Sequence, residues 1–451
     1  MGIAQSGTAN TLQTFSRKTD VTTTFGQGPL SEAACKVLDL AGGPVHCLRL
    51  TGSVAGANGA VTKTAIGAST GTITLAGAPF DDYEGRVEIM VTGTLGTARF
   101  RYSLDDERTF SEEIVVPAAG TYLIPSTNVT VTFVAGAGPV FFEDGDIHEW
   151  VSTAPYYSTA DVATAVTALL AQTVEFPFII LTGQPSTAAN AATMFAALGT
   201  HATTFQTANR FIAWIMSFGN DTTGNTQTQL AGVTSSRIMP VYGRCDVSSS
   251  KTFAGYGSPS RPAVEIVGAR AAQSLISTDL ARVASGPLDG VVGISHDEAL
   301  TELIDAHRCT TLRSLTGRSG FFVTNGRIKS AAGSDFRYWQ HRRVMDVICR
   351  RAFVEQQQFL SMGVRTTSTG TIDERDATRL EAIVNSALRA ELTQPANAEG
   401  TRGHVSAIAY AIDRQQNLIT TETLLSTIPS RPLGYAKNVT TTIGYSLTVG
   451  G

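Results

Sequence analysis

The hydrophobic pattern changes twice along the chain, and these changes constrain the fold more than any single motif. Between about residues 67 and 155, short alternating runs such as GRVEIMVTGT and NVTVTFVAG are separated by Gly, Pro and Asp turns. This spacing is typical of a β-sandwich or a small barrel. On both sides, helical periodicity alternates with short apolar runs, which indicates a parallel or mixed α/β layer. The sequence therefore predicts a multidomain α/β or α+β protein with an all-β module inserted in a surface loop.

The same changes divide the 451 residues into three predicted domains. We expect an α/β middle domain from residues 1–60 together with 155–320. The inserted β-domain is expected over 61–154, and a C-terminal domain over 321–451.

Periodicity and stop signals place the individual elements. The predicted helices cover residues 30–41, 159–172, 186–206, 222–235, 261–283, 335–361 and 373–392. The last helix opens with Thr371-Ile372-Asp373-Glu374, which fits a capping box. Strands are predicted at 45–50, 176–183, 211–218, 237–244 and 321–325, with a hairpin from 404–413 and 417–427.

The closing residues 438–451 are patterned as a β-strand that carries no charge and no proline. One face of this strand holds Val439, Thr441, Ile443, Tyr445, Leu447 and Val449. Edge strands are usually protected by lysine, proline or a bulge, because an open edge recruits other chains. The segment is expected either to pair with an earlier strand of its own domain or to be donated to another subunit.

Charged residues make up only 16% of the chain, against about a quarter in typical domains. A low charge content suits a surface that neighbouring subunits cover, and it also suits a β-rich extracellular protein. The net charge of −4 offers no electrostatic basis for direct binding of nucleic acid.

The sequence shows no sign of export or of membrane insertion. The N-terminus lacks a basic region followed by an apolar run, and no stretch approaches the ~18 apolar residues of a membrane span. We expect a protein that is made in the cytoplasm and stays soluble until it assembles. The five cysteines have no metal-type spacing and are expected to be buried thiols, with intermolecular disulfides as the alternative. They are Cys35, Cys47, Cys245, Cys309 and Cys349.

Motifs for chemistry fail on their context. Residues 67–71 match GxSxG, but a nucleophile elbow needs a helix after the turn and here a strand is predicted. Gly26-Gln27-Gly28 lacks the third glycine of a dinucleotide loop, and no GxxxxGK[ST] sequence occurs. His296 and His307 are too far apart for common ligation and are expected to be solvated or core histidines. No catalytic residue, cofactor or metal is predicted.

The densest polar cluster has two possible roles. Its members are Glu143, Asp144, Asp146, His148 and Glu149. Carboxylates at this density can bind a hard cation, but the EF-hand spacing is absent. The run EDGD between two strands favours an ordinary turn.

Five arginines lie within the predicted helix 335–361. They are Arg337, Arg342, Arg343, Arg350 and Arg351. One interpretation is a set of intramolecular ion pairs with Asp335, Asp346 and Glu355. The other is a cationic surface that meets an acidic partner.

The C-terminal third carries a family resemblance. The run NGRIKSAAGSDFRYWQHRRVMDVICRRAFVEQQ, then a helix, a hairpin and RPLGYAKNVTTTIGYSL, resembles the tail sheath proteins of contractile-tailed bacteriophages. The early run FGQGPLSEAACKVLDLAGGPVHCLRL resembles the same family. The β insert, with GTARFRYSLDD and FFEDGDIHEW, is similar to a module of phage sheaths.

The resemblance implies a non-enzymatic, structural subunit of a virion tail that is assembled in the host cytoplasm. It implies hexameric rings stacked as a helical polymer around a tail tube, with baseplate and tail terminator proteins as further partners. The lattice would switch from an extended to a contracted state. Residues 439–449 would be the donated arm, and the arginine-rich helix would contact the tube or a neighbouring subunit. No cofactor and no membrane span are implied.

One departure from the family concerns the N-terminus. Family members usually carry an N-terminal strand and arm before the segment that matches MGIAQSGTANTLQTF, and this sequence begins partway into that strand. Two alternative functions remain at this point. One is a virion adhesion or receptor-binding protein built on the β insert, and the other is the sheath of a phage-derived bacteriocin or injection system. An α/β-hydrolase-like enzyme is disfavoured by the GxSxG context.

Overall fold

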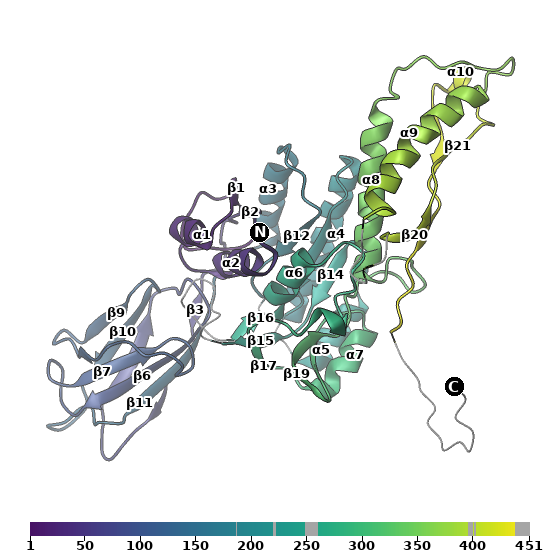
Figure 1. Ribbon diagram of the computed structural model, residues 1–451. Helices are drawn as coiled ribbons and strands as arrows, with labels where there is room; N and C mark the ends of the chain where they lie inside the picture. The colour runs from purple at the N-terminus through teal and green to yellow at the C-terminus, as the bar shows by residue number, and fades with distance from the viewer. Residues whose placement is uncertain (186, 220–221, 249–259, 396–399, 401–402, 438–451) are drawn as a thin grey trace, which may run out of the picture. The chain divides into compact units, whose positions relative to one another are not determined.

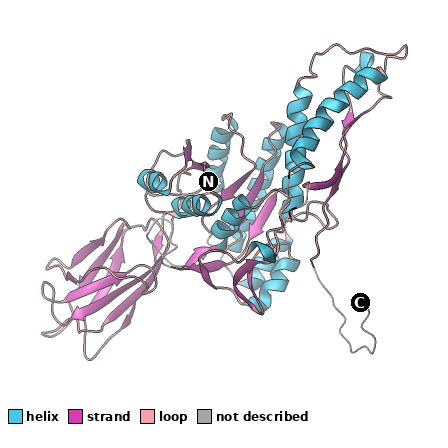
Figure 2. Ribbon diagram, in the orientation of Figure 1, coloured by secondary structure: helices cyan, strands magenta, loops and turns pink. Residues whose placement is uncertain are grey.

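A computed structural model describes residues 1–451 except 186, 220–221, 249–259, 396–399, 401–402 and 438–451 (Figure 1). The chain forms two compact units, Met1–Arg350 and Arg351–Gly451. The domain boundary expected at 320/321 falls inside β19 (Arg318–Val323), which pairs with β18 (Leu312–Leu315) in the first unit. Helices and strands are mixed through most of the chain, which confirms the predicted α/β class (Figure 2).

A parallel sheet lies at the centre of the first unit. Its strands are ordered β12 (Phe178–Leu181), β13 (Ala213–Ser217) and β14 (Ile238–Val241). Every residue of β13 is buried, as expected for a central parallel strand with both faces covered. Alternate residues of β13 belong to two different hydrophobic cores, so the sheet separates two packed layers.

Helices cover both faces of this sheet. One face packs against α3 (Thr159–Leu170) and α4 (Ala188–Thr207), and the other packs against α6 (Ala263–Gln273). The predicted helices 159–172, 186–206 and 222–235 correspond to α3, α4 and α5 (Thr223–Ala231). The prediction of a helix over 261–283 was too long. Arg343 donates to the carbonyls of Ala271 and Ser274, and these bonds satisfy carbonyls at the end of α6.

The N-terminal residues pack against the same layer. The strands β1 (Leu12–Phe15) and β2 (Val45–Leu48) form an antiparallel pair. Between them lie α1 (Lys18–Phe25) and α2 (Pro29–Ala41), and α2 packs against α6. Proline at the first position and Gly42 at the C-cap delimit α2.

Residues 57–153 fold into two antiparallel sheets. The order in one is β5-β10-β9, and in the other β3-β11-β6-β7-β8, with β4 paired to β11. Phe100, Phe133 and Phe142 fill the space between them in edge-on and tilted contacts. The strand bounds are Ala57–Asn58 (β3), Thr62–Thr64 (β4), Thr72–Ala76 (β5), Tyr83–Val91 (β6), Arg99–Ser103 (β7), Ile114–Val115 (β8), Thr121–Ile124 (β9), Val129–Val134 (β10) and Ile147–Thr153 (β11).

A further antiparallel sheet of the first unit follows the parallel sheet in the chain. Its order is β16 (Ser260–Pro262), β15 (Arg244–Val247) and β17 (Val291–Ile294), all antiparallel. A 3-10 turn, Val283–Ser285, precedes β17 in the chain. A second one, Glu298–Leu300, and the short helix α7 (Thr301–Ala306) follow it.

The second unit consists of helices and short paired strands. The helix α8 (Trp339–Gln357) enters it, and α9 (Glu374–Leu392) follows. Asp373, not Thr371, caps α9: its carboxylate accepts from the Arg375 N–H. The strand bounds are Val405–Ile408 (β20), Ala411–Ile412 (β21), Ser426–Thr427 (β22) and Ser430–Pro432 (β23).

The predicted hairpin partner was placed too early in the chain. β20 pairs with β23 and β21 with β22, whereas Leu418–Thr421 forms the short helix α10. Asn417 caps α10 by accepting from the Thr420 N–H, a local bond that competes with a strand.

Candidate functional site

The main candidate site of the first unit is an apolar cavity beside Met1. The Met1 amino group donates to the Ile180 carbonyl at 2.8 Å, and the Met1 carbonyl accepts from the Thr182 N–H at 2.8 Å. On its other side, Gly2 donates to Leu48 and accepts from Leu50. Both patterns are those of parallel pairing. Residues 1–2 therefore lie between the line of β2 and the line of β12, and bond to both.

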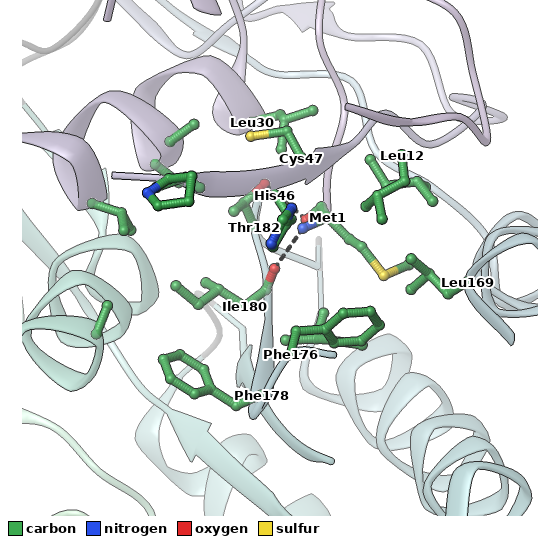
Figure 3. A pocket seen from close by; sticks show the side chains of 18 of the residues that line it. Met1, Leu12, Leu30, His46, Cys47, Leu169, Phe176, Phe178, Ile180 and Thr182 are labelled. Atoms are coloured by element: carbon green, nitrogen blue, oxygen red, sulfur yellow. Dashed lines mark hydrogen bonds between the residues drawn. The ribbon is translucent and has the colours of Figure 1, made fainter. Parts of the chain in front are cut away.

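A cavity of about 190 Å³ continues this position beyond Met1, between the two strands (Figure 3). Residues 44–48 line one wall and residues 176–180 line the other. Leu30 of α2 and Leu169 of α3 close its two sides. We call this cavity the strand slot. It lies between the β1-β2 pair and the β12-β13-β14 sheet.

The strand slot is apolar and carries no side-chain carboxylate, lysine or arginine on its walls. His46 and Cys47 are the titratable side chains that line it. Burial raises the pKa of the Cys47 thiol to about 11, so this thiol stays protonated near neutral pH. Burial also lowers the pKa of the Met1 amino group to about 6. The Cys47 thiol and the Met1 amino group therefore both favour their uncharged forms.

The second unit presents an open strand edge of a different kind. β21 pairs with β22 on one side and is covered by α9 on the other. Asn385 accepts from the Tyr410 N–H and donates to the Tyr410 carbonyl, and Glu381 accepts from the Ile412 N–H. No such cover is found, among the residues that the structure describes, for the outer side of residues 426–432. That edge is interrupted by Pro429 and Pro432, which lack an N–H. The predicted donor strand, residues 439–449, lies outside the described residues.

The arginines of the predicted contact helix differ in burial. Arg342 is only 4% exposed and lies 2.6 Å from Asp346, which also lies 2.9 Å from Arg237. Arg343 lies over the Phe178 ring, and burial lowers its pKa to about 10. These two arginines have intramolecular partners.

The other arginines lie nearer the surface. Arg350 is 3.9 Å from Glu175, and Arg351 is 2.8 Å from Glu355. Arg337 is exposed, beside the Tyr338 ring. Contact of these residues with a tube or a neighbouring subunit stays a prediction, and exposure makes Arg337 the member best placed for it.

A buried ionic cluster, which sequence reasoning missed, anchors the sandwich to the α/β layer. Arg261 lies 3.0 Å from Asp81, and Arg244 lies 2.7 Å from Asp82. Burial raises the pKa of Asp81 to about 7, even though the charge of Arg261 opposes this rise. The partners come from sequence positions far apart, so the only local signal was a charged residue inside an otherwise apolar run, as in SRPAVEIVG.

The remaining polar candidates have structural roles. Ser69 of the GxSxG match donates to Asp146, and the strand β5 follows, so the elbow geometry is absent there. Burial alone would raise the pKa of Asp146, but N–H groups of Ile66 and Glu143 donate to it and lower the pKa. Asp146 thus holds a turn. His296 contacts the Leu312 carbonyl at 3.0 Å.

The cysteines do not form disulfides in this structure. Cys35, Cys47, Cys245 and Cys309 are buried, whereas Cys349 is partly exposed. In the described part of the chain, no group of three or more His, Cys, Asp or Glu side chains is placed to hold a metal ion. None of the described helices is both long and apolar enough to cross a membrane.

A family model described as "DUF2586, N-terminal domain" matches residues 1–327. The chain belongs to the DUF2586 family. No curated protein matches it.

Three solved structures illustrate what this DUF2586 protein is similar to. The sheath tail protein of Desulfitobacterium hafniense shares 12% identity at a TM-score of 0.46, covering 96% of this chain and 94% of that one. The sheath tail protein of Listeria innocua shares 10% identity at a TM-score of 0.45, covering 96% of this chain and 94% of that one. The contracted helical sheath of the anti-feeding prophage shares 13% identity at a TM-score of 0.45, covering 65% of this chain and 77% of that one.

Proposed function

We propose that this DUF2586 protein is a structural subunit of a contractile tail sheath, which polymerises by donating strands between copies. One observation carries the proposal: the second unit leaves the strand edge at residues 426–432 without a partner among the described residues, and the chain then continues into an uncharged, strand-patterned segment. Two-stranded sheets are only marginally stable alone, so an added strand stabilises them.

Strand donation suits a lattice that moves. Each added backbone hydrogen bond contributes about 0.5–1.5 kcal/mol net, so a short arm holds several kcal/mol. Such a link stays intact while side-chain contacts between subunits change. A head-to-tail contact of this kind generates an open helix unless its rotation closes, and stacked hexameric rings around a tube are one form of such a helix.

The sequence resemblance to phage tail sheaths supplies the specific assembly. In that assembly the partners are further copies, a tail tube, a baseplate and a terminator, and contraction drives the tube through the target envelope. The energy of contraction is stored in subunit packing, so the mechanism requires no nucleotide.

Negative-stain microscopy and sedimentation velocity of the purified full chain test the proposal. We expect tubes or stacked rings that become more abundant with concentration, and we expect deletion of residues 438–451 to abolish them while the circular dichroism spectrum is kept. A full chain that remains monomeric at high concentration would contradict the proposal. Unfolding of the deletion variant would show that the closing strand belongs to its own domain.

A further inference from the structure

We propose that the contact between the β-sandwich and the α/β layer is a proton-controlled latch, which is tight while Asp81 carries a proton and loosens when this carboxyl ionises. Asp81 lies on the sandwich side, just before β6, and it meets a buried group of charges from the α/β layer. The inference does not rest on the proposed sheath function, because it concerns a contact within one chain.

Carboxylates outnumber guanidiniums at this contact, among the residues that the structure describes. Asp81, Glu32 and Glu265 are each 1% exposed, and Arg261 is 2% exposed. An ionised side chain that is buried without a counter-charge is costly, so bound protons balance the excess. The carboxylates are Glu32 of α2, Asp81 and Asp82 before β6, and Glu265 of α6, and the guanidiniums are Arg244 of β15 and Arg261 of β16.

The two guanidiniums already have carboxylate partners. Arg244 lies 2.7 Å from Asp82. Arg261 lies 3.0 Å from Asp81 and 3.5 Å from Glu32. Asp81 and Glu32 come from opposite sides of the contact, so the charge of Arg261 is shared across it.

Hydrogen bonding indicates which carboxyls hold the protons. Asp81 Oδ2 and Glu265 Oε2 are buried and have no hydrogen-bond partner among the described residues. Hydrogen bonds stabilise an ionised carboxylate, so a buried oxygen without a donor favours the protonated form. Asp82 differs, because one of its oxygens accepts from the Ala154 N–H and the other accepts from Arg244.

The pKa values agree with this assignment. Burial raises the pKa of Asp81 to about 7 and holds the pKa of Glu265 well above its ordinary range, although the charge of Arg261 opposes both shifts. Burial would also raise the pKa of Asp82, but the charge of Arg244 lowers it. Near neutral pH, Glu265 therefore stays protonated and Asp82 stays ionised, whereas Asp81 changes its form.

The other titratable neighbours keep one form over the same range. Burial raises the pKa of Cys35 and of Cys245 to about 12, and it raises the pKa of Tyr83 as well. Lys36 of α2 donates to the Asp289 carbonyl at 2.8 Å, and its ammonium lies 3.9 Å from the Asp289 carboxylate.

Loss of the Asp81 proton weakens the contact. Ionisation of Asp81 places two negative charges, on Asp81 and Glu32, beside the single guanidinium of Arg261. The pKa of Asp81 is about 7 in the closed contact, against an ordinary value of 3.8. Because the closed form binds the extra proton between these two values, the equilibrium constant for opening rises by up to about tenfold per pH unit across this range and levels off above it.

Infrared titration of the full chain tests the proton directly. A protonated carboxyl absorbs at a different frequency from a carboxylate, and we expect a protonated band that shrinks as the pH rises through about 7. Asp81→Asn should lack the shrinking part of the band. Glu112→Gln, at an exposed position of the sandwich, should keep it. A full chain without a carboxyl band that titrates near this pH would overturn the inference.

Hydrogen exchange tests the loosening. The Asp82 N–H donates to Asp81, and the Ala154 N–H donates to Asp82. We expect the protection factors of these amides, corrected for the intrinsic effect of pH on exchange, to fall by up to about tenfold per pH unit from pH 5.5 to 7. Those of β10 should not fall. In Asp81→Asn the decline should be absent, because asparagine keeps the shape of the protonated acid and does not titrate.

The outcomes separate the latch from simpler explanations. A decline that persists unchanged in Asp81→Asn would assign it to other residues and overturn the inference. Constant protection in the full chain, together with a titrating carboxyl band, would show a buried proton that controls no contact. If Asp81→Asn does not fold, the two measurements on the unmodified chain decide. Neither requires polymerisation, so failure of the latch and failure of the sheath function are distinguishable.

Discussion

The β-sandwich and the second unit are both small, yet they are stabilised in different ways. The sandwich encloses its own aromatic core, in which Phe100, Phe133 and Phe142 are 2% exposed or less. In the second unit the strands come in pairs, and residues 421–437 bury no side chain. Leu360 and Ile419 there are 76% and 64% exposed. The sandwich therefore covers its own core, whereas the second unit leaves large apolar side chains at its surface.

The strongest test of this contrast removes part of the sandwich core. Phe133→Ala should destabilise the sandwich by about 3–5 kcal/mol, because it deletes a buried ring and leaves a cavity. Hydrogen exchange resolved by peptide should show lost protection in β5, β6 and β10 and little change in α9. Leu123→Ala, at a 58% exposed position of the same module, is the control. Equal loss of protection in α9 would show that the two regions do not fold independently.

Acidification should affect the sandwich through His148. This ring is fully buried, and burial lowers its pKa from 6.5 to about 4. Because the folded pKa is below the unfolded value, the stabilisation is present above pH 6.5 and is lost as the pH falls through 4, by up to ~1.4 kcal/mol per pH unit.

We therefore expect His148→Leu to flatten the pH dependence of sandwich unfolding between pH 6.5 and 4, as measured by urea titration at several pH values. Phe142→Leu alters the same core without a titratable group and should keep the slope. An unchanged slope in His148→Leu would assign the acid sensitivity to other residues.

A smaller effect is expected where α9 covers a strand edge. Asn385→Ala leaves the Tyr410 amide and carbonyl without their side-chain partner, at a cost of about 1–2 kcal/mol. Faster exchange of the Tyr410 amide, with Ser386→Ala as the exposed control, would show this. If exchange is unchanged, the cover by α9 does not protect that edge.

The smallest effect on the isolated chain is expected at Arg337. Its side chain is exposed, so Arg337→Ala should change the free energy of unfolding by less than ~0.5 kcal/mol. Arg342→Ala should cost several times more, because Arg342 is buried against Asp346. If Arg337→Ala nevertheless impairs assembly, Arg337 contacts a neighbour or the tube. Normal assembly would remove it from the predicted contacts.

The sequence predicted the periodic parts of the fold well. Alternating helices and strands from residue 158 onward were found near their predicted positions, because amphipathic patterns and caps such as Ser158 act locally. The errors arose where tertiary contacts decided the structure. Arg343 bonds to the end of α6 from a distant helix, and α10 replaces a predicted strand.

The candidate site was only half visible in the sequence. The closing segment was recognisable by its period of two and its lack of charge. The strand slot was not, because its walls, residues 44–48 and 176–180, come from distant parts of the chain and each reads as an ordinary buried strand. Only the folded structure brings these two segments to opposite sides of one cavity.

Hydrogen exchange of the full chain, before and after polymerisation, tests the central claim most directly. Peptides that cover residues 438–451 report on the closing segment. We predict that these amides become strongly protected in the polymer, because a donated strand forms backbone hydrogen bonds, while those of the sandwich core do not change. Polymers in which the closing segment exchanges as fast as in the monomer would contradict the account.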